Sequence, residues 1–200
     1  MSKITVDTVE PATGTSLTLG ASGDTITVPS GATIANSGTA TGFGKVLQVV
    51  NATKSDTNST TSNTAVTTGL EASITPSATS SKVLVLISFA YQADSDTNSI
   101  FQLYRGSTAI HLGDAAGSRE RASVGTVYQK PGAANDILSA SINCLDSPST
   151  TSATTYKLMY FVGRSASSGA PVYLNRGHTD TDNDSHKRAI SSITLMEIEG

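Results

Sequence analysis

The sequence predicts an all-β protein, in which an extended N-terminal β shaft or anchor (residues 1–44) precedes an antiparallel β-sandwich of the jelly-roll type (residues 45–200). Short apolar segments alternate with Ser and Thr, which together supply 58 of the 200 residues. Gly, Pro, Asn and Ser separate these segments, as they do in turns between strands. No stretch of ten residues has the apolar spacing of an amphipathic helix. Charged residues make up only 14% of the chain.

Residues 1–44, here called the leader, contain short segments in which apolar residues alternate with Thr. These segments are 4–6, 17–19, 26–28 and 32–34. Burying one such side chain is worth about 1.5–3 kcal/mol, whereas ordering each residue costs about 1–2 kcal/mol of backbone entropy. We therefore expect the leader to become ordered only beside other copies of itself. A leader that never folds is the alternative, and the regular alternation argues against it.

Residues 42–44, Gly-Phe-Gly, are the expected hinge, after which the sandwich begins. Its strongest strand is 82–91, which is apolar on both faces at its start. We expect this strand to be central and to be covered by a second sheet or by another subunit. The other expected strands are 45–50, 64–74, 99–104, 108–112, 122–129, 137–145, 156–163, 188–198 and a short one at 172–174. Eight or nine strands with long loops suit a jelly roll.

The run GDTITVPSGATIANSGTATGFG (residues 23–44), preceded by MSKITVDTVEPATGTSLTLG, resembles the N-terminal region of tail-fibre-like virion proteins of marine phages, cyanophages and their relatives. Residues 187–198 resemble the last strand of such proteins. The resemblance implies a homotrimeric phage virion structural protein of the tail-fibre type. Its N-terminal segment would attach it to the particle, and its head would bind the host surface.

Two other functions remain open. The first is a capsid-decorating, cementing or head-fibre protein that stabilises the particle mechanically. The second is a secreted lectin-like module, although no export signal supports it. The expected partners are the chain itself, other virion proteins of the tail or capsid, and a host-surface glycan or protein. The expected location is the virion, after synthesis in the host cytoplasm.

Composition also limits the function. A net charge of −3 gives no reason to expect nucleic-acid binding. The chain has no run of 18 apolar residues, so we expect no membrane insertion. The chain lacks GxSxG, HExxH, CxxC and phosphate-loop motifs, so we expect no enzymatic activity, no catalytic residue and no cofactor. Cys144 is expected to be a small buried core residue.

The most conspicuous polar segment is 178–188, in which Asp180, Asp182 and Asp184 alternate. It is not an EF-hand, because Ser185 and Ser191 stand where Gly and Glu are required. We expect a solvated loop and no metal site. Specific calcium binding is one alternative. The other is an ion on a threefold axis, held by His178 or His186 from each copy.

Two further polar loops are 94–98, expected to form turns, and 114–121, in which Arg119 and Arg121 flank Glu120. The second is expected to be an exposed loop or an intersubunit ion pair, with anion or sugar recognition as the alternative. The tyrosines of the predicted strands are assigned to the core or to an interface: Tyr104, Tyr128, Tyr156, Tyr160 and Tyr173. Host binding is expected in the loops 54–63, 94–98, 113–121, 146–154 and 178–187.

Overall fold

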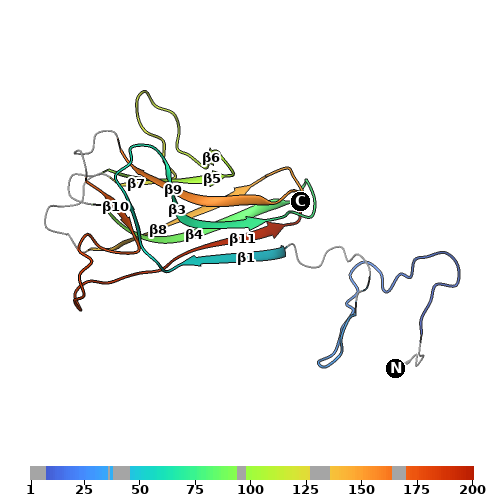
Figure 1. Cartoon of the computed structure of the whole chain (residues 1–200). Coiled ribbons are helices and arrows are strands. Elements are labelled where there is room, and N and C mark those ends of the chain that lie inside the picture. Colours follow the sequence, from blue (N-terminus) through green and yellow to red (C-terminus); the bar gives the residue numbers. More distant parts are fainter. Residues whose placement is uncertain (1–7, 36, 38–45, 94–97, 127–135, 164–169) are drawn as a thin grey trace. The chain divides into compact units, whose positions relative to one another are not determined.

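The computed structural model describes residues 8–35, 37, 46–93, 98–126, 136–163 and 170–200. The chain forms two compact units, Met1–Phe43 and Gly44–Gly200, which we call the leader unit and the head domain. The described residues form strands, turns and loops (Figure 1). None of them forms a helix long and apolar enough to cross a membrane.

Sheet A contains β1 (Val46–Lys54), β11 (Ser191–Ile198), β4 (Lys82–Ala93) and β8 (Leu138–Asp146), in that order and antiparallel throughout. The end of β4 extends beyond β11 and pairs there with β10 (Val172–Leu174). β2 (Asn58–Thr60) pairs with the other side of β10.

Sheet B contains β3 (Val66–Ile74), β9 (Thr154–Val162) and β5 (Ser99–Arg105), again antiparallel. The outer side of β5 is shared by β6 (Thr108–Ile110) and β7 (Val124–Thr126), one on each half of the strand. The connection from β6 to β7 leaves the sheet and returns to it. The all-β class with two antiparallel sheets is therefore confirmed.

The long strands and the short strand β7 pair in a nested order. β1 pairs with β11, β3 with β9, β4 with β8, and β5 with β7. Strands from the first half of the head domain thus pair with strands of the second half in reverse order. Contacts of β4 with β11 and of β5 with β9 complete the two sheets.

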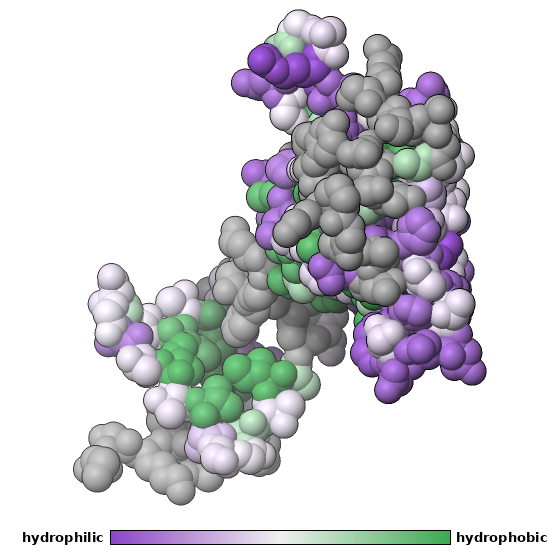
Figure 2. Space-filling view, turned by 90° about the vertical axis from the view of Figure 1, so that its left-hand side faces the viewer, coloured by the Kyte–Doolittle hydropathy of each residue, from purple (hydrophilic) through white to green (hydrophobic). Residues whose placement is uncertain are grey.

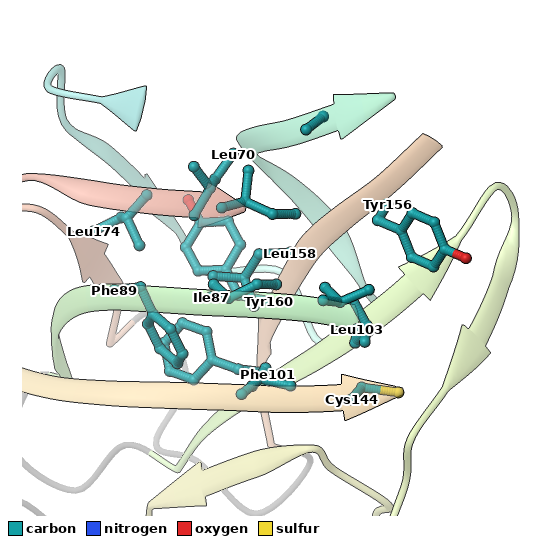
Figure 3. Close-up of a cluster of buried hydrophobic side chains, with 14 of the residues drawn as sticks. Leu70, Ile87, Phe89, Phe101, Leu103, Cys144, Tyr156, Leu158, Tyr160 and Leu174 are labelled. Carbon is teal, nitrogen blue, oxygen red and sulfur yellow. The ribbon is translucent and has the colours of Figure 1, made fainter. Parts of the chain in front are cut away.

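The core lies between the two sheets and is built on β4. The strand buries alternate residues against sheet B, and both of its sides are paired, so it is central as predicted. Phe101 of β5 places its ring centroid 4.7 Å from that of Phe89 and 4.8 Å from that of Tyr91. Figure 3 shows Phe89 and Phe101 in the same core as Tyr160 and Leu158 of β9, and the ring centroids of Phe101 and Tyr160 lie 6.2 Å apart. Such aromatic contacts are worth about 0.5–1.5 kcal/mol beyond the area they bury.

Three strand predictions differ from the described residues by more than two positions. The polar segment 54–63 contains β2, which was not expected because Asn58-Ser59-Thr60 has no apolar residue. β1 extends four residues beyond the predicted end at Val50. β11 begins at Ser191 and not at Arg188, because Arg188 instead forms an isolated bridge with Arg176.

The described leader residues, 8–35 and 37, contain turns but no strand. The predicted strands 17–19, 26–28 and 32–34 are therefore not formed in this single chain, and segment 4–6 and the hinge 42–44 lie outside the described residues. Gly23 and Gly31 have φ of +94° and +86° and occupy the third position of turns closed by backbone hydrogen bonds. Glycine is the residue that type II turns require there. The sequence thus determines these turns, but the segments between them have no neighbouring strand with which to pair.

Apolar side chains of the leader unit remain in contact with solvent. Leu19, Ile26 and Ile34 are 60%, 62% and 63% exposed. Figure 2 shows a cluster of apolar surface on this unit. One copy of the leader therefore does not bury its own apolar residues.

The two ends of the head domain differ in what they carry. β1 begins where β4 begins and where β8 and β11 end, because Val46 and Lys82 both pair with Ile198. We call this the proximal end, since the leader joins β1 there. At the opposite, distal end β1, β4 and β9 end, and the segment 176–190 lies there.

A buried carboxylate joins three elements at the proximal end. Glu197 of β11 is 1% exposed. It accepts hydrogen bonds from Gln48 Nε2 of β1 at 2.7 Å and from the amide and hydroxyl of Ser77, both at 2.6 Å. Burial by itself would raise the pKa of Glu197, but the hydrogen bonds from Ser77, Gln48 and Ser81 outweigh it and lower the pKa from 4.5 to about 2.

A second carboxylate joins the two sheets at the same end. Asp146 of β8 accepts hydrogen bonds from Arg105 Nη1 at 3.0 and 2.9 Å, and from the Tyr156 hydroxyl at 2.6 Å. Burial and the hydrogen bond to Asp146 raise the pKa of Tyr156, so the phenol stays protonated. The proximal end is therefore closed by two polar clusters rather than by apolar packing.

We expect Glu197→Gln to lower the free energy of unfolding of the head domain by about 1–3 kcal/mol at pH 7, since one carboxylate oxygen becomes an NH₂ facing the Gln48 donor. Because the pKa of Glu197 is lowered on folding, its contribution is complete above the ordinary pKa of 4.5 and is lost as the pH falls toward 2. Urea denaturation followed by circular dichroism from pH 7 to pH 2 measures both effects.

The matched control is Glu199→Gln, which removes an exposed carboxylate two residues further on. It is expected to leave stability unchanged. Equal effects of the two substitutions would show that Glu197 acts only through net charge.

Candidate interaction surfaces

The structure places the five predicted binding loops at three different locations. Segments 54–63 and 178–187 begin at or belong to the distal end, Asn98 lies at the same end directly before β5, and 146–154 lies at the proximal end. The segment 113–121 lies on the flank of sheet B, between β6 and β7. Of 94–98, only Asn98 is among the described residues, and its carbonyl accepts a hydrogen bond from the Gly163 amide at 2.8 Å.

The loop 178–187 is held by its own polar groups. Arg188 Nε and Nη2 donate to the two carboxylate oxygens of Asp180 at 3.0 and 2.8 Å. This pair lowers the pKa of Asp180 and raises that of Arg188. Asn183 Oδ1 accepts hydrogen bonds from the amide and hydroxyl of Ser185 at 2.9 and 2.8 Å, which is an Asx turn. The loop behaves as a solvated, locally structured segment.

The three alternating aspartates do not converge. Asp180 is engaged by Arg188, and no group of three His, Cys, Asp or Glu side chains in the described part of the chain could hold a metal ion. His186 Nδ1 lies 2.8 Å from the Thr181 hydroxyl. The His178 ring lies against the Tyr173 ring, with centroids 5.6 Å apart, and Arg176 lies 4.2 Å over the same ring. An ion shared between copies stays an alternative for these histidines.

Asn175 anchors this loop, and the sequence analysis did not identify it. Its side-chain amide donates to the carbonyls of Lys54 and Asp56 at 2.8 and 3.0 Å, and its Oδ1 accepts from the Ser191 hydroxyl at 2.6 Å. Its own carbonyl accepts from the Ala189 amide at 2.9 Å. The residue is fully buried and has φ of +61°, a left-handed conformation that Asn tolerates better than most residues.

The segment 113–121 covers part of the outer face of sheet B. Gln102 Nε2 of β5 donates to the Arg121 carbonyl at 2.6 Å, and Arg121 Nε donates to the Gly113 carbonyl at the same distance. The Glu120 carboxylate lies against Gly163, where a Cβ would come within 2.8 Å of Oε2. Arg119 and Arg121 are exposed, as predicted.

A hollow of about 420 Å³ lies beside this segment. It combines aromatic rings with amide, carboxylate and guanidinium groups, and its lining residues are Asn63, Thr64, Ala65, Gln102, Tyr104, Leu112, Glu120, Arg121 and Phe161. Loops 54–63 and 113–121 thus meet here. Tyr104, assigned to the core or an interface from the sequence, faces this hollow. These residues are spread between positions 63 and 161 of the sequence, so only the fold brings them together.

Cys144 and the predicted tyrosines differ in where the structure places them. Cys144 is buried in the core, as predicted, and burial raises the pKa of its thiol. Tyr156 and Tyr160 are fully buried in the core, one of the two locations predicted for them, whereas Tyr173 is buried outside the core cluster against Arg176 and His178. Tyr128 lies outside the described residues.

Comparison with known proteins gives no further assignment. No protein-family model matches the chain, and no curated protein is significantly similar to it.

Asn175→Ala is expected to destabilise the head domain by about 3 kcal/mol or more, since it removes buried hydrogen bonds and leaves at positive φ a residue without the polar side chain that lets Asn adopt this conformation. Asn175→Gly removes the same bonds but relieves the backbone. It should therefore be about 1–2 kcal/mol less damaging. Chemical denaturation of both variants measures the difference. Wild-type stability in Asn175→Ala would contradict the anchoring role.

EDTA is expected to leave the melting temperature of the protein unchanged, because the aspartates of loop 178–187 are not arranged around a cation. Differential scanning calorimetry with EDTA and then with added Ca²⁺ tests this. A fall of several degrees that calcium reverses would establish the metal alternative instead.

Proposed function

We propose that this chain is a structural protein of a phage virion, of the tail-fibre type. The leader unit attaches it to the particle, and the head domain presents a surface to the host. The observation that supports this function most strongly is that the chain divides into two units. One has exposed apolar side chains, and the other is a separate sandwich. The first strand after the leader, β1, begins at the end of this sandwich opposite to the ends of β4 and β9 and to the segment 176–190.

The leader supports an anchoring role because its extended segments lack pairing partners and a cover for their apolar side chains. Its described residues have well-defined turns, yet the segments between the turns have no ladder partners and keep their apolar side chains exposed. A chain of this kind gains stability by adding its free strand edges and apolar side chains to neighbouring chains. Those neighbours are other copies in a shaft, or virion proteins at the attachment point.

The head domain is proposed to be a jelly roll. In that fold a long antiparallel hairpin rolls up, so that early strands pair with late strands in reverse order. The pairs β1–β11, β3–β9, β4–β8 and β5–β7 support this assignment. We propose that three copies assemble into a homotrimer, as tail-fibre-type proteins do.

Host attachment needs no chemical step, so the role proposed here is non-enzymatic and requires no cofactor, nucleic acid or membrane insertion. Several weak contacts to a surface glycan or protein become strong when copies bind together. The hollow beside 113–121 supplies aromatic and polar groups suited to such contacts. The protein is made in the host cytoplasm and resides in the virion.

A capsid-decorating or head-fibre role is the second candidate, and the exposed apolar residues of the leader favour it equally. There the leader would lie across capsid subunits and stabilise the assembled shell. Labelling the protein on intact particles in the electron microscope separates the two. Copies on the tail support attachment, and copies on the capsid support decoration.

Deletion of residues 1–40 should give a head domain that folds but no longer joins particles, because the two units are separate. Particles assembled with the truncated or the full-length protein, supplied in trans, are purified and probed for it. Circular dichroism controls for folding. Normal incorporation of the truncated protein would refute the anchor assignment.

A further inference from the structure

The outer face of sheet A carries a continuous row of apolar side chains. Strand register places Val49 of β1 opposite Met196 of β11, Met196 opposite Leu84 of β4, and Leu84 opposite Leu145 of β8. All four point away from the core, since their neighbours along each strand are the residues that face it. Val49 is 57% exposed and Leu145 is 55% exposed.

Further apolar residues flank this row on the proximal side. Val46 pairs with Ile198, and Leu47 lies at a bulge between Val46 and Gln48. Val46 and Leu47 are 51% and 47% exposed. Leu86 follows on the distal side of the row, between Thr194 and Asn143. The apolar surface is therefore widest at the end where the leader joins the head domain.

The same face is almost free of charge. Beyond the apolar residues named above, its outward positions on β1, β4, β8 and β11 are Asn, Ser and Thr, together with the buried Ala90 and Gln92 at the distal end of β4, and Lys82 at the proximal edge is the charged residue among them. The outer face of sheet B differs, because Glu71 pairs there with Lys157, which in turn pairs with Tyr104. An ordinary solvent-facing sheet surface resembles sheet B and not sheet A.

The size of the face fits an interface between two proteins. Four strands about 4.8 Å apart and about eight residues of about 3.3 Å each give an area of about 500 Å². Two such faces together reach the roughly 1,000 Å² that a specific interface needs.

We infer that this face of sheet A is covered by the same face of the other copies of the chain, which meet around the axis of the proposed homotrimer; the inference deepens the proposed fibre-type function and rests on it. A neutral face packs against a copy of itself without burying unpaired charge, whereas a charged partner would lose the hydration of its ions. The leader ends directly before β1, so each copy that is added through this face also brings a further leader into the assembly. Those leaders are the neighbours that the leader lacks in one chain.

The two internal methionines provide a matched test on the full-length protein. Met196 lies in the apolar row, and Met159 faces outward from β9 of sheet B; both are partly exposed. Oxidation by hydrogen peroxide follows access to the sulfur. In the oligomer, Met196 is expected to oxidise at least tenfold more slowly than Met159, and on dilution to monomer the two rates should converge. Peptide mass spectrometry measures both rates.

Val49→Glu combined with Leu145→Glu places carboxylates in the row at exposed positions, so the fold should persist. Sedimentation equilibrium should show association at least 100-fold weaker than in the wild type, with unchanged circular dichroism. The control is Thr67→Glu combined with Ser73→Glu, at exposed outward positions of β3. It should associate normally. If the variant with the two glutamates on sheet A misfolds, the methionine oxidation rates of the wild-type protein test the inference by themselves.

A wild-type protein that stays monomeric, or an oligomer in which Met196 and Met159 oxidise equally fast, would overturn the inference. Failure of the proposed function looks different. In that case the protein associates through sheet A and protects Met196, yet the full-length chain does not join particles.

Discussion

The central strand β4 is apolar on both faces, and the rest of the architecture depends on how each face is covered. One face is buried by sheet B, where Phe89 and Tyr91 pack on Phe101. The other face places Leu84 and Leu86 in the outer surface of sheet A, which a single copy leaves open. A strand of this composition is stable when both surfaces are removed from water. The same sequence feature thus specifies a sandwich and, in our proposal, its assembly.

Buried polar groups, rather than more apolar packing, close the sandwich at its ends. At the proximal end Glu197 and Asp146 accept hydrogen bonds from strands of both sheets and from the β3–β4 loop. At the distal end Asn175 joins the link after β1 to the start of β11. Each group has defined partners, so a slipped register would leave it unsatisfied at a cost of about 1–3 kcal/mol. These contacts fix the strand register that aligns Val49, Met196, Leu84 and Leu145.

The sequence predicted those elements whose signal is local. Alternating apolar residues identified β4, β5, β9 and β11, and Gly with Pro or Ser identified the turns of the leader. β2 was missed because Asn58-Ser59-Thr60 carries no apolar residue and pairs only because β10 lies beside it. The leader segments were predicted as strands from the same alternation, but a strand also needs a partner, which one chain does not supply. Asn175 and the hollow lined by Tyr104 and Phe161 depend on residues distant in the sequence, so no local pattern could reveal them.

Leader and sheet A pose the same physical problem, since each exposes apolar side chains that only another chain can cover. Hydrogen exchange of the leader amides, combined with native mass measurement of the full-length protein over a dilution series, tests this dependence most directly. We expect an oligomer whose amides between residues 17 and 34 exchange slowly, and fast exchange of the same amides once dilution gives the monomer. A dilute monomer with a protected leader would contradict the account.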